Sequence, residues 1–432
     1  MTSDDIGIGL LGLGVVGSSV ARVLSEKCSE IRAMIGRSVS LRRVLVRDTE
    51  KQRLYDVSDK ILTTDPEDVL ADPDVNIVVE LIGGETPAYD YILDSITRGK
   101  SVITANKVVM ARHGPELLTE ASGSGAHLMF EASVAAGTPI IAPLLRDLVA
   151  NKVLSIHGII NGTTNYILTQ MSKEGADFDQ ALSEAQDLGY AEAEPDDDIE
   201  GNDAAYKLAI LSTLAFRARV RDVDVHREGI TGLKARDFRY ARELGYTIKL
   251  MAISSRLGST LQARVHPVLV PETELIAKVD GVMNAIEIET DLAGRVLFHG
   301  AGAGPLPTSS AVVADLLSVC RYLAGKAPPP AKLSLDDDLS VQPMRELETK
   351  YYLRMQVIDC HGVLAQIARI LGDLHISIDS VLQKGTDAVT STAELVLTTH
   401  VASEEAMQQA LRHVRKLDVV REVGVMVRIQ GW

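Results

Sequence analysis

Several residue types are scarce in this 432-residue chain. It has one tryptophan, five phenylalanines and only three cysteines, Cys28, Cys320 and Cys360, with no CxxC pair. Three scattered cysteines provide no disulfide framework. The first apolar stretch, IGIGLLGLGVVG, carries five glycines and is too short to span a bilayer. These absences argue against a disulfide-rich secreted protein and against an N-terminal membrane anchor.

Basic residues are also in deficit. The chain has 44 Lys and Arg against 59 Asp and Glu, a net charge of −15 with a pI near 5.2. Nucleic acid and anionic membranes are therefore poor partners. The first residues, MTSDD, are acidic, unlike the basic start of a secretory signal. With 46% hydrophobic and 24% charged residues, we expect a cytoplasmic globular protein of about three domains.

In residues 1–150, short apolar runs alternate with amphipathic segments. Strands are predicted at IGIGLLG, SLRRVLVRD, NIVVELIGG, SVITANK and AHLMFEA, and helices at VVGSSVARVLSEK and YDYILDSITRG. Strands that alternate with helices imply right-handed crossovers between parallel strands. The sequence therefore predicts an α/β, Rossmann-like, doubly wound parallel sheet.

The pattern changes after residue 150. Three helices are predicted within 161–175, 176–189 and 202–216, followed by β-rich runs such as LQARVHPVLVP and AIEIETDL. We interpret 151–324 as an α+β domain, with a helix in 300–324 packing back on the first domain. Residues 325–348 contain three consecutive prolines and resemble an extended linker. Residues 349–432 read βαββαβ, which is the ferredoxin-like motif.

A glycine-rich loop follows the first predicted strand and opens the first predicted helix. It reads Gly12-Leu13-Gly14-Val15-Val16-Gly17. In a GxGxxG loop the first glycine permits a tight turn, the second lets a pyrophosphate approach, and the third lets helix pack on strand. The helix N-terminus then offers free N–H groups to phosphates. We expect a nicotinamide dinucleotide here.

The residues after the second predicted strand leave NAD and NADP both open. Asp48 would suit the ribose 2′-OH of NAD, whereas Arg47, with Lys51 and Arg53 close behind, would suit the 2′-phosphate of NADP. We favour NADP slightly, with dual use allowed. Lys107 ends the run SVITANK, at the carboxyl end of a predicted strand, where open α/β sheets bind ligands.

The most acidic stretch, Gly189 to Lys207, holds seven carboxylates and one lysine. Asp203 and Lys207 are four residues apart on a predicted helix and project from the same face. An exposed ion pair there would mean little. The alternative is a site in which carboxylates bind a cationic substrate group and a protonated lysine neutralises a developing alkoxide. The residues alone leave both interpretations open.

Longer motifs carry a family resemblance. The stretch AQDLGYAEAEPDDDIEGNDAAYK at 185–207 closely resembles the homoserine dehydrogenase signature, with Glu194 as a conservative departure. Similar motifs are GLGVVG, TANK at 104–107, EASVAAGTP at 131–139, NGTTNYIL at 161–168 and GAGAGPLPT at 300–308. The resemblance implies NAD(P)-dependent interconversion of L-aspartate 4-semialdehyde and L-homoserine, in the pathway to threonine, methionine and isoleucine.

The resemblance also implies residue roles. Lys207 resembles the proton donor, and Lys107 the lysine at the reacting end of cofactor and substrate. The resemblance implies three substrate-binding carboxylates, Glu192, Asp203 and Asp198. Gly189 and Gly304 match backbone positions that line the cofactor. The loop at 131–139 resembles a monovalent cation loop, in which Glu131, Val134, Ala136 and Thr138 would bind sodium mainly through carbonyl oxygens.

The C-terminal unit resembles an ACT regulatory domain. Its loop reads Asp359-Cys360-His361-Gly362, where ACT loops of this kind usually have proline before the glycine, and the missing proline loosens the backbone. Threonine is the allosteric ligand that the resemblance implies, and an ACT unit favours a homodimer or homotetramer. Without a partner at metal-ligand spacing, His361 is interpreted as a loop residue rather than a metal ligand.

Two other classes of function remain open. A cofactor-binding metabolite sensor would have lost catalysis, against which the presence of Glu192, Asp203 and Lys207 argues. A semialdehyde dehydrogenase acting through a thiohemiacetal would need a nucleophilic cysteine. Cys28, after the first helix, Cys320, in an apolar helix, and Cys360, in the C-terminal loop, are all poorly placed for that role.

Overall fold

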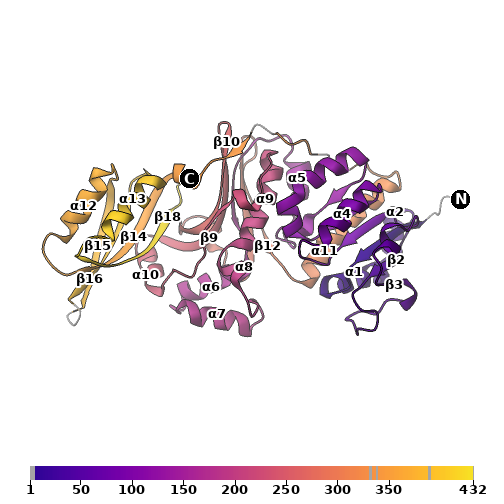
Figure 1. Ribbon diagram of the computed structural model, residues 1–432, viewed down its shortest axis with the longest axis horizontal. Coiled ribbons are helices and arrows are strands. Elements are labelled where there is room, and N and C mark those ends of the chain that lie inside the picture. Colours follow the sequence, from indigo (N-terminus) through magenta and orange to yellow (C-terminus); the bar gives the residue numbers. More distant parts are fainter. Residues whose placement is uncertain (1–4, 330–332, 337–338, 388–390, 432) are drawn as a thin grey trace. The chain divides into compact units, whose positions relative to one another are not determined.

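A computed structural model of the chain describes residues 5–329, 333–336, 339–387 and 391–431. They form two compact units, each assembled from separate stretches of sequence. Unit 1 comprises Met1–Ile156, Tyr206–Val225 and Asn284–Ser340, and unit 2 comprises His157–Ala205, His226–Met283 and Val341–Trp432. Figure 1 labels the main elements of both units.

Unit 1 is built on a six-stranded parallel sheet of order β3-β2-β1-β4-β5-β6. The strands are β1 (Asp5–Leu11), β2 (Ser38–Leu45), β3 (Leu62–Thr63), β4 (Ile77–Glu80), β5 (Ser101–Thr104) and β6 (Leu128–Met129). The order runs outward in both directions from the β1–β4 pair, which is therefore the topological switch point where such sheets bind ligands. The predicted doubly wound sheet is confirmed.

Helices flank this sheet in Figure 1. They are α1 (Val15–Glu26), α2 (Cys28–Ile35), α3 (Glu67–Leu70), α4 (Ala88–Thr97), α5 (Lys107–Ser124) and, from much later in the sequence, α11 (Pro305–Leu323). Val312 and Leu316 of α11 share one buried apolar cluster with Val20 of α1 and Ile8 of β1. Strands β11 (Met283–Thr290) and β12 (Gly294–Ala301) are neighbours in a sheet and precede α11.

Unit 2 contains a long antiparallel hairpin, β9 (Tyr246–Leu257) with β10 (Thr260–Pro271). Its helices are α6 (Gly162–Lys173), α7 (Phe178–Asp187), α8 (Asp196–Ile199) and α10 (Ala235–Glu243), and the short strand β8 (His226–Arg227) pairs with β10. Helices α6 and α7 fall in the two windows predicted from the sequence. The chain of β7 (Val153–Ile159) and of α9 (Asn202–Phe216) belongs partly to each unit.

The C-terminal part of unit 2 is the predicted βαββαβ fold, which is confirmed. Its elements are β14 (Glu348–Ile358), α12 (Val363–Asp373), β15 (Ile378–Asp387), β16 (Thr392–Thr399), α13 (Glu404–Val414) and β18 (Val420–Ile429), with a short β17 (Ala402–Ser403) beside β14. The strand order is β18-β14-β16-β15 and the pairs are antiparallel. Buried apolar side chains of α12, α13 and the sheet form one core.

Strand β18 also pairs in parallel with β10, through Val268 opposite Arg428 and Leu269 opposite Ile429. The C-terminal sheet therefore continues into the β9–β10 hairpin. Between α11 and β14 the chain forms β13 (Ser340–Val341), and Asp336 bridges to Ala218. Of the predicted domains and linker, residues 1–4, 330–332, 337–338, 388–390 and 432 lie outside the described residues.

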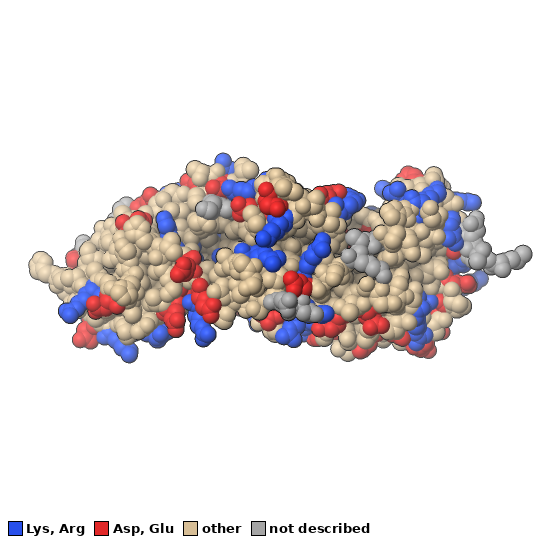
Figure 2. Space-filling model, turned by 90° about the horizontal axis from the view of Figure 1, so that it is seen from above, with Lys and Arg blue, Asp and Glu red and all other residues tan. Residues whose placement is uncertain are grey.

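Short helical turns complete the described elements. They are η1 (Asp59–Ile61), η2 (Glu131–Ser133), the π-helical η3 (Pro143–Asp147), η4 (Asp222–Asp224), η5 (Ile276–Lys278) and η6 (Met344–Glu346). No helix in the described part of the chain is long and apolar enough to cross a membrane. On the face drawn in Figure 2, lysines and arginines lie intermixed with aspartates and glutamates.

Candidate active site

In the turn between β1 and α1, a different physical reason explains the glycine at each position of the GxGxxG loop. Gly12 has a φ of +97°, which L side chains rarely adopt. A Cβ on Gly17 would lie 2.1 Å from the carbonyl oxygen of Gly12, so only glycine lets the helix pack this closely. A Cβ on Gly14 would meet nothing within 4 Å. The open side of the loop therefore lies at Gly14, where the pyrophosphate of a dinucleotide would approach.

A cavity of about 620 Å³ lies beside this loop in unit 1. Gly12, Leu13, Gly14 and Val15 line it, whereas Val16 and Gly17 pack toward the core. The volume is within the usual range for a cofactor site.

The side chains expected to distinguish NADP from NAD line the same cavity. Arg47, Asp48, Lys51 and Arg53 are all on its wall. Strand β2 ends at Leu45, earlier than predicted, and so these four residues lie in the loop after the strand. The donor set of this loop, three cations and one carboxylate, fits a cofactor phosphate.

The turn after β4 is held by a buried carboxylate that the sequence did not single out. Glu80 is fully buried, accepts hydrogen bonds from the N–H groups of Ile82 (2.8 Å) and Gly83 (3.2 Å), and accepts one from Thr104 Oγ1 (2.6 Å). Burial raises the pKa of Glu80, and the hydrogen bonds from Thr104 and the backbone only partly oppose it. Glu80 therefore ties the ends of β4 and β5 together at the edge of the sheet where ligands bind.

The same edge positions Lys107. Asn106 caps α5 by accepting from the N–H of Val109 at 3.1 Å, and its side-chain amide donates to the carbonyl of Gly84 at 2.7 Å. These two bonds fix the start of α5 against the turn after β4. Lys107, half-buried, is the first residue of α5 and so emerges at the carboxyl end of β5.

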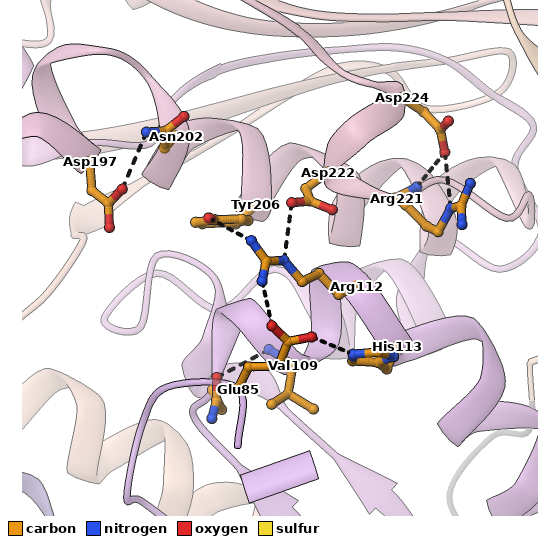
Figure 3. Close-up of polar contacts among 11 residues, drawn as sticks. Glu85, Val109, Arg112, His113, Asp197, Asn202, Tyr206, Arg221, Asp222 and Asp224 are labelled. Atoms are coloured by element: carbon orange, nitrogen blue, oxygen red, sulfur yellow. Dashed lines mark hydrogen bonds and ion pairs between the residues drawn. The ribbon is translucent and has the colours of Figure 1, made fainter. Parts of the chain in front are cut away.

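Arg112, one turn further along α5, joins four elements of unit 1, as Figure 3 shows. Its guanidinium bonds to the Glu85 carboxylate, donates to Asp222 Oδ2 at 3.3 Å and to the Tyr206 hydroxyl at 3.4 Å. Glu85 also bonds to His113 Nε2 at 2.8 Å. Hydrogen bonds from His113 and Arg112 lower the pKa of Glu85. Tyr206 precedes Lys207 on α9, so this cluster connects the helix of Lys107 with the helix of Lys207.

In unit 2, the acidic stretch is organised by an asparagine. Asn161 donates from Nδ2 to Asp198 Oδ1 at 2.6 Å and to Asp203 Oδ2 at 2.8 Å. Its Oδ1 accepts from the N–H of Thr164 at 2.8 Å and caps α6. Asp203 is 2% exposed. Two of the three predicted substrate carboxylates are therefore brought together by a residue of the NGTTNYIL motif, to which no role was assigned.

The remaining predicted residues of this stretch are placed differently. Glu192 is exposed, and its backbone carbonyl accepts from Gln186 Nε2 at 3.1 Å. Gly189 follows α7 with a φ of +73°. Lys207 is buried on α9, four residues after Asp203 on the same helix. Lys207 and Asp203 therefore do not form the solvent-exposed ion pair that was one of the two interpretations of the sequence. In unit 1, Gly304 is the N-cap of α11, with a φ of +120°.

The candidate cation loop is closed by its own backbone and one carboxylate. Both carboxylate oxygens of Glu131 are used by the N–H groups of Ile140 (2.6 Å), Ile141 (2.9 Å) and Ala142 (2.7 Å). A cation would therefore meet carbonyl oxygens here rather than the Glu131 side chain. Ala136 N–H donates to Gly302, and Thr138 Oγ1 lies 3.5 Å from the Ala301 carbonyl.

A second buried carboxylate supports this loop. Asp315 of α11 accepts from the backbone N–H of Glu131 at 2.8 Å. Burial raises the pKa of Asp315 to about 8, against the effect of that hydrogen bond. Within the described residues, no group of three His, Cys, Asp or Glu side chains could hold a metal ion.

Comparisons with known proteins cover almost the whole chain. Residues 12–131 match the family model described as homoserine dehydrogenase, NAD binding domain, residues 139–317 match homoserine dehydrogenase, and residues 351–419 match the ACT domain. A homoserine dehydrogenase of Neisseria gonorrhoeae is 42% identical over 99% of both chains, and one of Bacillus subtilis is 38% identical over 99% of this chain and 98% of its own.

Solved structures agree with these matches. A homoserine dehydrogenase from Thiobacillus denitrificans has a TM-score of 0.91 and 43% identity, over 99% of this chain and 98% of its own. A hyperthermophilic archaeal homoserine dehydrogenase in complex with NADPH has a TM-score of 0.63 and 28% identity, over 76% of this chain and 99% of its own. The chain belongs to the homoserine dehydrogenase family, oxidoreductases acting on CH–OH groups, and carries a C-terminal ACT domain.

Proposed function

We propose that the chain interconverts L-homoserine and L-aspartate 4-semialdehyde with NADP or NAD, in the pathway to threonine, methionine and isoleucine. The observation that carries the proposal is the network of Asn161, Asp198 and Asp203 on the approach to α9, the helix that bears Lys207. Two carboxylates held by one amide suit an ammonium group, and a buried lysine suits proton transfer to oxygen.

In this mechanism the bound nicotinamide supplies or accepts the hydride, and the chain's own residues handle position and proton. Asp203 and Asp198, with Glu192 from the adjacent loop, hold the substrate ammonium group. Lys207 donates its proton to the carbonyl oxygen as negative charge develops on it, and takes the proton back in the reverse direction. Lys107 contributes a second positive charge at the reacting end. Burial of Lys207 strengthens its interaction with that oxygen because the local dielectric is low.

The cofactor would bind along the GxGxxG loop, with its phosphates at the start of α1. Arg47, aided by Lys51 and Arg53, would hold the 2′-phosphate of NADP, and Asp48 would allow NAD. Backbone atoms of Gly189 and Gly304 would line the nicotinamide. Sodium would bind the carbonyl oxygens of the 131–138 loop, which the packing of the Glu131 carboxylate leaves as the suitable donors.

The remaining parts of the proposal concern organisation. We divide the chain into a cofactor domain at 1–150, a substrate-binding, catalytic and dimerisation domain at 151–324, a linker at 325–348 and a regulatory ACT domain at 349–432. Threonine would bind the ACT domain as feedback inhibitor, and the protein would work in the cytoplasm as a homodimer or homotetramer.

The cysteines do not favour the thiohemiacetal chemistry of a semialdehyde dehydrogenase. Cys320 is buried in α11, and burial raises the pKa of its thiol to about 12, so the nucleophilic thiolate is disfavoured. Cys28 and Cys360 are exposed, in α2 and in the turn before α12. Neither lies on the wall of the dinucleotide cavity.

The decisive experiment measures NADPH and NADH oxidation with aspartate semialdehyde, for the native chain and for Lys207→Ala. Loss of a general acid should lower kcat by about 10²- to 10⁴-fold, with cofactor binding unchanged by fluorescence titration. Lys173→Ala, at an exposed ion pair with Asp280, is the matched control and should retain activity. Full turnover by Lys207→Ala would exclude the proton-donor role, and absence of turnover in the native chain would favour a sensor.

A further inference from the structure

A second cavity, of about 350 Å³, lies within unit 2, apart from the residues that line the dinucleotide cavity. It is bounded by β10, by the start of β14 and by the end of β18, where the ACT sheet joins the β9–β10 hairpin. Several polar side chains of its wall are themselves buried, with relative exposures of 1% for His266, 2% for Arg428 and 9% each for His157, Gln262 and Gln430. Polar groups buried around a cavity normally have partners, so their hydrogen bonds are informative.

Arg428 is fully engaged with protein carboxylates. It forms two hydrogen bonds of 2.8 Å to Glu228 and bonds of 2.6 and 2.9 Å to Glu404. Although burial opposes it, these carboxylates hold the pKa of Arg428 above its usual range. Arg428 therefore shapes the wall but has little donor capacity left for a ligand.

Arg264 of β10, in contrast, has a hydrogen-bond donor that no described residue uses. Among the residues that the structure describes, it donates to Gln262 Oε1 at 2.9 Å, and its Nε has no hydrogen-bond partner. Burial and the neighbouring charge of Arg428 lower the pKa of Arg264 to about 10. Arg264 is partly buried and forms no direct ion pair with a carboxylate among the described residues, so a ligand carboxylate would stabilise its charge.

The same wall carries hydrogen-bond acceptors without partners. His266 Nδ1 lies 2.9 Å from the Pro267 carbonyl, which can only accept, so Nδ1 holds the proton and Nε2 of the neutral ring is an acceptor. That Nε2 has no partner among the described residues. Gln430 bonds to His157 Nδ1 through one end of its amide, and the other end has no described partner whichever way the amide is turned.

We propose that this cavity is a binding site for a small amino carboxylate. Arg264 would hold the carboxylate, and the acceptors on His266 and Gln430 would receive hydrogen bonds from the ammonium group. Glu348 lies exposed on the same wall and adds a carboxylate for that end. The volume fits a free amino acid and is too small for a dinucleotide. The unpaired positive charge of Arg264 excludes a metal cation at the same position.

Because the site lies where β10 meets β18, ligand binding there would affect the pairing of the two strands. A ligand that contacts β10 and β18 at once binds only when the two strands are paired, so it stabilises that pairing by mass action. The site uses neither the loop at Asp359 nor the residues assigned to catalysis. It is therefore independent of the proposed reaction.

The test is calorimetric titration and thermal unfolding of the full chain with L-serine, L-threonine and L-methionine at millimolar concentration. Propionate and ethanolamine, which carry only one of the two charged groups, serve as single-ended probes. At least one amino acid should bind and raise Tm. Arg264→Gln should weaken that binding roughly tenfold to a hundredfold, the usual effect of a lost hydrogen bond to a charged group. The same variant without ligand should be at least as stable as the native chain, because a partly buried charge without an ion-pair partner has been removed.

Arg256→Gln, half-buried on the neighbouring strand β9, is the matched control and should bind normally. Asp359→Asn, in the ACT loop, should also bind normally. The proposal is overturned if no amino acid binds, if Arg264→Gln binds as well as the native chain, or if Asp359→Asn alone abolishes binding. Equal affinity for propionate would overturn the assignment of the ammonium to His266 and Gln430.

Discussion

Replacing Asp237 by alanine should destabilise the attachment of the ACT sheet to α10. Asp237 is fully buried in the first turn of α10. It accepts from Arg354 Nε at 2.6 Å, from the Tyr352 hydroxyl at 3.2 Å, and from the Lys234 N–H at 2.9 Å. Arg354 and Tyr352 belong to β14 of the ACT sheet, whereas Lys234 is the N-cap of α10.

The magnitude follows from what the substitution leaves behind. Arg354 is 2% exposed, and with Asp237 gone the nearest described carboxylate is Glu394, at 3.9 Å. Burial opposes the charge of Arg354, but the hydrogen bonds and charge of Asp237 raise its pKa overall. Removing one partner of a buried ion pair costs about 3–5 kcal/mol, and the lost bond to the α10 N-terminus about 1 kcal/mol more. The free energy of unfolding should fall by about 4–6 kcal/mol.

The assay is urea unfolding followed by circular dichroism, with hydrogen exchange across β14 and α10 to locate the effect. The double variant Asp237→Leu/Arg354→Met removes both charges and should recover most of the loss. Glu67→Ala breaks the exposed pair with Arg98 and should cost about 1 kcal/mol or less. A loss of under about 1 kcal/mol for Asp237→Ala, or a double variant no more stable than the single one, would refute the reasoning.

Three further predictions concern unit 1. Arg112→Ala should lower kcat about tenfold or more, with little change in the KM for the cofactor. Arg112→Lys should not restore kcat, because an ammonium group cannot bond to several partners as the planar guanidinium does. Steady-state kinetics of both variants checks this. Arg47→Gln should raise the KM for NADPH by more than the KM for NADH, and equal effects would contradict a 2′-phosphate contact. Asp315→Asn should flatten the pH dependence of the free energy of unfolding. The pKa of Asp315 is raised to about 8 in the folded state, so the folded state binds an extra proton and the free energy of unfolding falls between about pH 4 and pH 8. Urea unfolding at pH 5 and at pH 8 should therefore differ less for the variant than for the native chain.

The sequence predicted well where function depends on a short local pattern. The glycine loop is recognisable because two of its positions must lack a Cβ, Gly12 for the backbone angle and Gly17 for helix packing. The helices α6 and α7 and the βαββαβ order were also accessible, since each shows its periodicity within one segment. Helix α2 was missed because the run Cys28–Ile35 is only eight residues long and has no capping side chain, although Ile31 and Ile35 lie on one buried face.

The sequence could not predict contacts between segments distant along the chain. Asn161 reaches Asp198 and Asp203 across 37 and 42 residues, and nothing in the local pattern distinguishes it from an ordinary helix cap. Arg112 meets Asp222 across 110 residues. Such contacts are set by tertiary packing, which local periodicity does not encode. Glu131 shows the same limit, since only the structure shows its carboxylate occupied by backbone N–H groups.

The join between β10 and β18 has an unusual chemical character. Domains can adhere through apolar surface alone, yet here two ion pairs, Arg354 with Asp237 and Arg428 with Glu404, are buried near the paired strands. The half-buried Glu228 also pairs with Arg428. Buried ion pairs add little net stability compared with apolar contacts, but they strongly penalise any arrangement in which one partner is left alone. The buried ion pairs therefore favour one register of β10 against β18 over registers shifted by one or more residues. Arg264, partly buried at the same join, forms no ion pair among the described residues, and its Nε is left for a small ligand. Ligand occupancy and the pairing of β10 with β18 should consequently rise and fall together.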